Sequence, residues 1–162
     1  MRSTRRRHDV ESGVISKNGK ELLNVLLVED NPAEACLTEE AFKESGVSHE
    51  MSTVSDGEAA MNFLRKMGDY DGKARPDLIL LDLNLPRMNG HEVLKEIKSD
   101  PELKSIPVIV VTNSNAASDI EAVYRSHGNC YLVKPPELSE FFDMVKHLVE
   151  FWWETTRLPA GD

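Results

Sequence analysis

The chain has 162 residues, of which 40% are apolar and 29% are charged, and its formal net charge is -9 at neutral pH. This length suits one domain with a substantial core, and the composition is ordinary for a globular protein. The negative charge argues against nonspecific nucleic-acid binding, and the apolar runs are far shorter than the ~20 residues of a membrane-spanning helix.

The first twenty residues differ in charge from the rest of the chain. Residues 1–20 hold six Lys or Arg against two Asp or Glu, which gives +4 and leaves -13 for the remainder. A basic segment with few apolar residues is typical of a disordered arm, with a tether to RNA or membrane as the alternative. We therefore predict an arm over residues 1–20, a folded domain over 21–153 and a tail over 154–162.

Strand-like and helix-like segments alternate five times after the arm. Short apolar runs predict strands at Asn24–Val28, His49–Val54, Leu78–Leu81, Val108–Val111 and Cys130–Val133. Helical spacing and capping residues predict helices over Ala33–Ser45, after an N-cap at Ser55, after the turn Asn89-Gly90, from Ser118 to near Gly128, and over Leu138–Trp153. This alternation indicates an α/β three-layer sandwich around a five-stranded parallel sheet.

The predicted strands lack polar alternation, as expected when helices cover both faces of a sheet. In such folds ligands bind in a crevice beyond the carboxyl ends of the strands. The residues that follow the strands are therefore the candidates for chemistry.

Charged and hydroxyl side chains follow four of the five predicted strands, namely Glu29 and Asp30, then Asp82, Thr112 and Lys134. Two carboxylates ~4 Å apart repel by roughly 1 kcal/mol in water and about 4 kcal/mol at a partly shielded site. Such a group therefore calls for a cation, and Mg²⁺ suits carboxylate oxygens. With an ammonium and a hydroxyl added, the set predicts a receiver for a phosphoryl group, and Asp82 on the central strand is the best nucleophile candidate.

The fragments LLVEDN, DLILLDLNLPRMNG, IPVIVVTNS and CYLVKPP resemble the motifs of two-component receiver domains. They occur in that family's order and spacing over about Leu23 to Trp153. The resemblance implies a flavodoxin-like fold with the strand order 2-1-3-4-5. It also implies that the chain is a response regulator, in which Asp82 is the phosphoacceptor.

The resemblance assigns further roles to residues around Asp82. Glu29, Asp30 and Asp82 are implied to bind Mg²⁺, for which Mn²⁺ could substitute, together with the backbone carbonyl of Asn84. Glu29 stands where the family commonly has aspartate. Thr112 and Lys134 are implied to contact the phosphoryl group.

Two further features are implied by the resemblance alone. Thr112 and Tyr131 are implied to form the switch that responds to phosphorylation. The peptide bond between Lys134 and Pro135 is implied to be cis. None of these roles follows from composition or spacing.

The stretches HLVEFWWETTRLPA and DLNLPRMNGHEVLKEIKSDPELKSIPVIV resemble the small single-domain regulators of cyanobacterial phytochrome histidine kinases. A histidine kinase, in particular a bacterial phytochrome, is therefore the expected partner. We expect no enzymatic activity beyond self-phosphotransfer and slow autodephosphorylation. Because the chain ends soon after the last predicted helix, we expect output through contacts with a downstream protein.

Two alternative functions remain open. The chain could be a degenerate receiver that docks without being phosphorylated, or a flavodoxin-like flavin binder. The acidic run Glu29-Asp30-Asn31 disfavours the flavin binder, since it would repel a bare phosphate.

The last predicted helix carries more apolar side chains than one face requires. A stripe facing the sheet is predicted to contain Leu138, Phe141, Phe142, Val145, Leu148, Val149 and Trp152. The surplus predicts a homodimer interface that includes Met144, Phe151, Trp152 and Trp153 and extends into the tail. A purely internal packing role is the alternative.

The two cysteines, Cys36 and Cys130, lie within apolar patterns and form no metal-binding spacing. They are therefore predicted to be buried free thiols in a reducing, cytoplasmic compartment.

Overall fold

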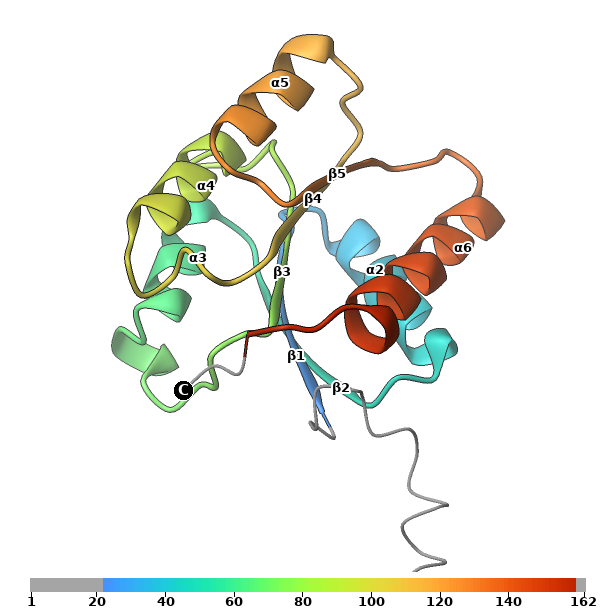
Figure 1. Cartoon of the computed structure of the whole chain (residues 1–162), viewed down its shortest axis with the longest axis horizontal. Helices are drawn as coiled ribbons and strands as arrows, with labels where there is room; N and C mark the ends of the chain where they lie inside the picture. The colour runs from blue at the N-terminus through green and yellow to red at the C-terminus, as the bar shows by residue number, and fades with distance from the viewer. Residues whose placement is uncertain (1–21, 160–162) are drawn as a thin grey trace, which may run out of the picture.

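A computed structural model describes residues 22–159 of the chain (Figure 1). The arm predicted over residues 1–20 lies outside this range, as do the last three residues of the tail. The five strands are β1 (Leu23–Val28), β2 (His49–Val54), β3 (Leu78–Leu81), β4 (Val108–Thr112) and β5 (Cys130–Val133). They form one parallel sheet in the order β2-β1-β3-β4-β5, so the predicted three-layer fold and strand order are confirmed.

Helices cover both faces of this sheet (Figure 1). One face is covered by α2 (Pro32–Ser45) and α6 (Leu138–Val149), and the other by α3 (Gly57–Leu64), α4 (Gly90–Ser99) and α5 (Ala117–Arg125). A short 3₁₀ turn, Gly68–Tyr70, precedes β3. Buried side chains of the sheet and the helices form two apolar clusters, one on each face. The sheet is thus buried on both faces, as its nearly continuous apolar strands predict.

Capping residues explain both ends of α2 and the starts of α3 and α4. The Asn31 side chain accepts hydrogen bonds from the first turn of α2, and Gly46 ends that helix with φ of 81°, a conformation that glycine adopts without strain. Asn89 and Glu92 form a reciprocal capping box at the start of α4. The predicted cap at Ser55 is displaced by one residue, because the side chain of Asp56 accepts the hydrogen bond from the third helical residue of α3.

The C-terminal helix changes its geometry after α6. Residues Glu150–Thr155 form a π-helical turn, in which the amide of Thr156 donates to the carbonyl of Phe151 at 2.8 Å. A π turn is wider than an α turn and shifts the phase of the residues that follow it. Trp153 consequently enters the core and is 2% exposed, whereas Trp152 is only half-buried. The predicted surface position of Trp153 is therefore wrong, whereas Trp152 packs partly against the core, on the side where it was predicted.

Other expectations also differ from the structure. Leu138, predicted to face the sheet, is 55% exposed at the start of α6. Cys36, predicted to be buried, is exposed, whereas Cys130 is partly buried. Residues 22–159 contain no cis peptide bond, so Lys134 and Pro135 are joined in the trans form. Within this range, none of the helices has both the length and the apolar character that a bilayer span requires.

Candidate functional site

The carboxylates predicted from the strand ends meet at one edge of the sheet. Val28 pairs with Leu81 in the parallel ladder of β1 and β3, so the residues that follow them emerge side by side. Glu29, Asp30 and Asp82 each offer a carboxylate oxygen, and these oxygens lie within 4.8 Å of one another. Oxygen atoms grouped in this way suit a hard divalent cation such as Mg²⁺.

Lys134 reaches this cluster from the end of β5. Its ammonium nitrogen lies 2.6 Å from Oε1 of Glu29 and 3.3 Å from Oδ2 of Asp82. The Lys134 side chain is only 7% exposed, and its backbone amide donates to the carbonyl of Thr112 at 2.8 Å. The lysine therefore points into the cluster, and its long side chain does so with a trans peptide bond to Pro135.

Burial and charge shift the pKa values of this pair. Burial raises the pKa of Glu29 to about 7, although the hydrogen bond and charge of Lys134 act in the opposite direction. Burial of Lys134 by itself lowers its pKa, but the hydrogen bond to Glu29, the charge of Asp82 and the hydrogen bond to Glu34 outweigh it and raise the pKa to about 12. Lys134 therefore stays protonated. Its single positive charge does not balance the negative charges of the carboxylates around it.

The other predicted site residues flank Asp82. Thr112 ends β4 with no exposed surface, next to the strand that carries Asp82. The backbone amide of Asn84 donates to Oδ1 of Asp82 at 3.2 Å. This contact orients the Asp82 carboxylate, whereas the predicted role of the Asn84 carbonyl as a metal ligand stays a prediction.

A polar network that sequence reasoning missed surrounds Tyr131. The Tyr131 hydroxyl donates to the backbone carbonyl of Ser114 at 2.9 Å, and the Ser114 hydroxyl donates to Asp119 at 2.6 Å. His91 of α4 lies 3.0 Å from the other oxygen of Asp119. Hydrogen bonds from Ser114 and His91 lower the pKa of Asp119. The network links Tyr131 to the segment that follows Thr112.

Glu34 is a second residue that sequence reasoning missed. It lies in the first turn of α2, where acidic side chains suit the helix dipole. Its Oε1 lies 3.0 Å from the ammonium of Lys134 and 3.4 Å from the side-chain amide nitrogen, Nδ2, of Asn113. Three carboxylates thus contact one lysine, those of Glu29, Glu34 and Asp82.

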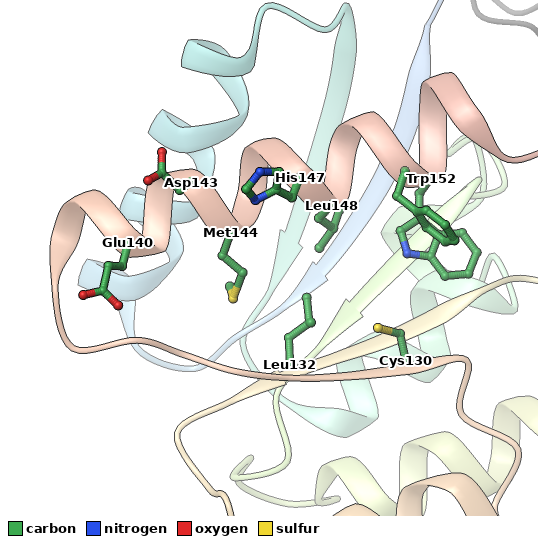
Figure 2. A pocket seen from close by; sticks show the side chains of 9 residues that line it. Cys130, Leu132, Glu140, Asp143, Met144, His147, Leu148 and Trp152 are labelled. Carbon is green, nitrogen blue, oxygen red and sulfur yellow. The ribbon is translucent and has the colours of Figure 1, made fainter.

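A separate groove runs between α6 and the exposed edge of the sheet at β5 (Figure 2). It measures about 510 Å³ and has a mostly apolar lining. Met144, Phe151 and Trp152, three of the four residues predicted at a dimer interface, contribute to this lining. Trp153 does not, because it is buried in the core.

The site joins the Asp82 carboxylate, two further carboxylates that could hold a divalent cation with it, a buried ammonium and a buried hydroxyl. This combination can receive a phosphoryl group, because the cations and donors offset the charge on its oxygens. The exposed side chain of Asp30 marks the side of the cluster that faces solvent.

Comparisons with known proteins agree with this chemistry. Residues 25–146 match the family described as the response regulator receiver domain. The response regulator Rcp1 of Synechocystis is 50% identical over 137 residues, which cover 85% of this chain and 93% of that protein. The methanogenesis regulatory protein FilR2 of Methanothrix harundinacea, described as probable, is 39% identical over 84% of this chain and 87% of that protein.

Two solved structures are similar over most of their length. The phosphorylated cyanobacterial phytochrome response regulator RcpA superposes with a TM-score of 0.82 at 52% identity, over 85% of this chain and 98% of that chain. The Mn²⁺-bound form of Rcp1 superposes with a TM-score of 0.80 at 49% identity, over 85% of this chain and 99% of that chain.

Proposed function

This chain belongs to the response regulator receiver domain family, and from that membership we propose that Asp82 accepts a phosphoryl group from a histidine kinase in a Mg²⁺-dependent phosphorelay. The observation that carries this proposal is the position of Lys134, whose ammonium lies 3.3 Å from Asp82 and 2.6 Å from Glu29, beside the cluster that Asp30 completes. A carboxylate beside a fixed cation is suited to attack phosphorus.

The proposed reaction forms one bond and breaks one bond at phosphorus. An oxygen of Asp82 bonds to the phosphorus of phosphohistidine while the bond from phosphorus to the imidazole nitrogen breaks. The imidazole keeps the electron pair, and Asp82 becomes an acyl phosphate. Lys134 offsets the negative charge of the phosphoryl oxygens, and the Thr112 hydroxyl donates a hydrogen bond to one of them.

Glu29, Asp30 and Asp82 would hold the divalent cation, with the backbone carbonyl of Asn84 as a further ligand. When bound, Mg²⁺ neutralises charge on the phosphoryl oxygens and on the carboxylates. The Mn²⁺-bound structure of Rcp1, which is 49% identical, supports the proposal that Mn²⁺ can substitute.

Mass spectrometry after treatment with acetyl phosphate tests the phosphoacceptor. The intact protein should gain the mass of one phosphoryl group when Mg²⁺ or Mn²⁺ is present, and none when the metal is chelated. Asp82→Asn should gain no phosphate. An undiminished gain in Asp82→Asn would disprove the assignment of Asp82.

Phosphorylation is proposed to act on a switch formed by Thr112 and Tyr131. The contact of the Tyr131 hydroxyl with the carbonyl of Ser114 supports this role, because it couples the side chain to the segment after Thr112. The surface around α5, β5 and α6 would then present different contacts to a downstream protein.

The proposed kinase partner is a bacterial phytochrome histidine kinase. The support is that RcpA, which is 52% identical, is described as a cyanobacterial phytochrome response regulator. The chain would act as a cytoplasmic signalling phosphoacceptor, with slow loss of its own phosphate as its only hydrolytic activity. Phosphotransfer assays against a panel of purified kinases test the partner, and a faster transfer from kinases without a phytochrome module would contradict the proposal.

The two alternative functions predict different results. A degenerate receiver that only docks would gain no phosphoryl mass from acetyl phosphate. A flavin binder would absorb visible light after purification and would not require a divalent metal.

The groove between α6 and β5 is the proposed homodimer interface. Phe151 is 52% exposed beside the half-buried Met144 and Trp152, and an apolar groove of this kind is typical of a partner surface. Phe151→Glu should shift the protein from dimer to monomer in light scattering at micromolar concentration. Leu37→Glu, at an exposed apolar position of α2, is the matched control. A monomeric wild-type protein, both with and without phosphorylation, would contradict the proposal.

The arm over residues 1–20 and the tail over 154–162 are proposed to flank the receiver domain, with Leu158 of the tail packed against the apolar cluster under α2 and α6. Deletion of residues 1–20 should leave folding and phosphorylation unchanged. A deletion variant that fails to fold would place the domain boundary earlier in the chain.

A further inference from the structure

Glu34 forms an ion pair with Lys134, whose ammonium the proposed reaction needs to offset the charge of the phosphoryl oxygens. Its Oε1 lies 3.0 Å from the ammonium of Lys134 and accepts a hydrogen bond from the side-chain Nδ2 of Asn113 at 3.4 Å. The side chain therefore connects the start of α2 to the segments that follow β4 and β5. Lys134 is itself a proposed phosphoryl contact, and Asn113 directly follows the other one, Thr112.

The position of Glu34 separates it from the metal-binding carboxylates. Its oxygens are not among the carboxylate oxygens of Glu29, Asp30 and Asp82 that lie within 4.8 Å of one another. A bound divalent cation would therefore neutralise those three groups more than it neutralises Glu34. A phosphoryl group that comes within contact distance of Lys134 also comes close to the Glu34 carboxylate, and like charges at such distances repel.

Glu34 is also reachable from outside the site. Its side chain is 30% exposed, whereas those of Lys134 and Asp82 are each 7% exposed. A protein that docks at this edge could place a cationic side chain against Glu34 and remove the repulsion. A small free phosphodonor brings no such cation.

We propose that Glu34 is a specificity determinant of the phosphoryl-acceptor site: it disfavours small free anionic donors such as acyl phosphates and favours a phosphohistidine presented by a protein with a cationic group near the donor. This inference rests on the proposed phosphoacceptor function of Asp82. With acetyl phosphate, an oxygen of Asp82 bonds to phosphorus, the bond from phosphorus to the acetyl oxygen breaks, and acetate leaves with the electron pair. The donor is an anion throughout, so Glu34 opposes its approach.

The Glu34→Gln variant tests this role, because an amide keeps the size of the side chain and an oxygen that can accept from Lys134 and Asn113. We expect the rate of phosphorylation by acetyl phosphate, at fixed Mg²⁺ and subsaturating donor, to rise about tenfold, which corresponds to about 1.4 kcal/mol. Glu34→Ala removes the same charge and should also raise the rate. Glu40→Gln is the matched control, since Glu40 lies on the same helix with a 55% exposed side chain and pairs with Lys43.

A second donor separates charge from geometry. Phosphoramidate carries less negative charge than acetyl phosphate at neutral pH, so the gain in Glu34→Gln should be smaller with phosphoramidate. Equal gains for the two donors, or a rate in Glu34→Gln that is unchanged or lower than that of the wild type, would overturn the inference. If the wild-type protein gains no phosphoryl mass on Asp82, the proposed function fails and the inference fails with it. If the wild type is phosphorylated but Glu34→Gln behaves like Glu40→Gln, only the inference fails.

Discussion

The ammonium nitrogen of Lys134 lies 2.6 Å from Oε1 of Glu29, and the two side chains are only 7% and 3% exposed. A buried pair of this kind contributes little compared with an apolar pair, but removal of one partner leaves a buried charge without compensation. This relationship makes the stability of the protein depend on the same residues as its chemistry.

Replacement of Lys134 by methionine should therefore lower the free energy of unfolding by about 3–5 kcal/mol when no divalent metal is present. Added Mg²⁺ should restore part of this loss, because it supplies positive charge to the same carboxylates. Urea unfolding followed by circular dichroism measures both effects. Lys43→Met is the control, because the pair of Lys43 with Glu40 is exposed and should contribute less than about 1 kcal/mol. Equal losses in the two variants would contradict the argument.

The raised pKa of Glu29 predicts a pH dependence of the metal-free protein. Burial raises the pKa from 4.5 to about 7, so the folded state holds a proton that the unfolded state releases. The stabilisation from this proton is fully present below about pH 4.5 and is lost as the pH rises through about 7. Between pH 5 and pH 8 the wild type should lose at most roughly 3 kcal/mol relative to Glu29→Gln. Urea unfolding at several pH values in chelator measures this difference, and parallel profiles for the two proteins would refute it.

The sequence predicts the sheet and the centre of the site well, because both depend on local patterns. Each strand is a short apolar run, and a parallel sheet brings the residues after its strands to one edge. Glu29, Asp82 and Lys134 therefore meet once the strand order is known. The order itself came from the family resemblance, because apolar runs do not specify which strands are neighbours.

The sequence does not predict contacts that depend on how a helix is oriented. Glu34 looks like an ordinary acidic residue in the first helical turn, and only the position of the first turn of α2 in the folded chain brings it to Lys134. The cap of α3 was assigned to Ser55 because Ser55 and Asp56 are both good caps, and residue type alone does not choose between neighbours. Regular helical spacing places Trp153 at the surface, and only the π turn brings it into the core.

A close backbone contact supports the loop that carries Asp82. A Cβ atom at Gly90 would lie 2.3 Å from the carbonyl oxygen of Asp82 and 2.6 Å from the Cα of Leu83. Gly90→Ala should therefore destabilise the protein by about 1–3 kcal/mol and slow phosphorylation, because the backbone at Asp82 must move. Gly72→Ala is the control, since a Cβ there has no heavy atom within 4 Å. Thermal unfolding and the acetyl phosphate assay check both effects, and a Gly90→Ala variant as stable and active as Gly72→Ala would contradict this prediction.

The π turn after α6 gives the two adjacent tryptophans different roles, and substitution can separate them. Trp153 is 2% exposed in the core, so Trp153→Ala should lower the free energy of unfolding by about 3–5 kcal/mol. Trp152 lines the groove and is half-buried, so Trp152→Ala should cost about 1 kcal/mol and should weaken the proposed dimer instead. Urea unfolding of both variants, at a concentration where light scattering reports monomer, measures the difference without a contribution from dimerisation. If Trp152→Ala proved the more destabilising of the two, the last turn would follow the regular α-helical phase, and Trp153 would return to the set of surface residues available to a partner.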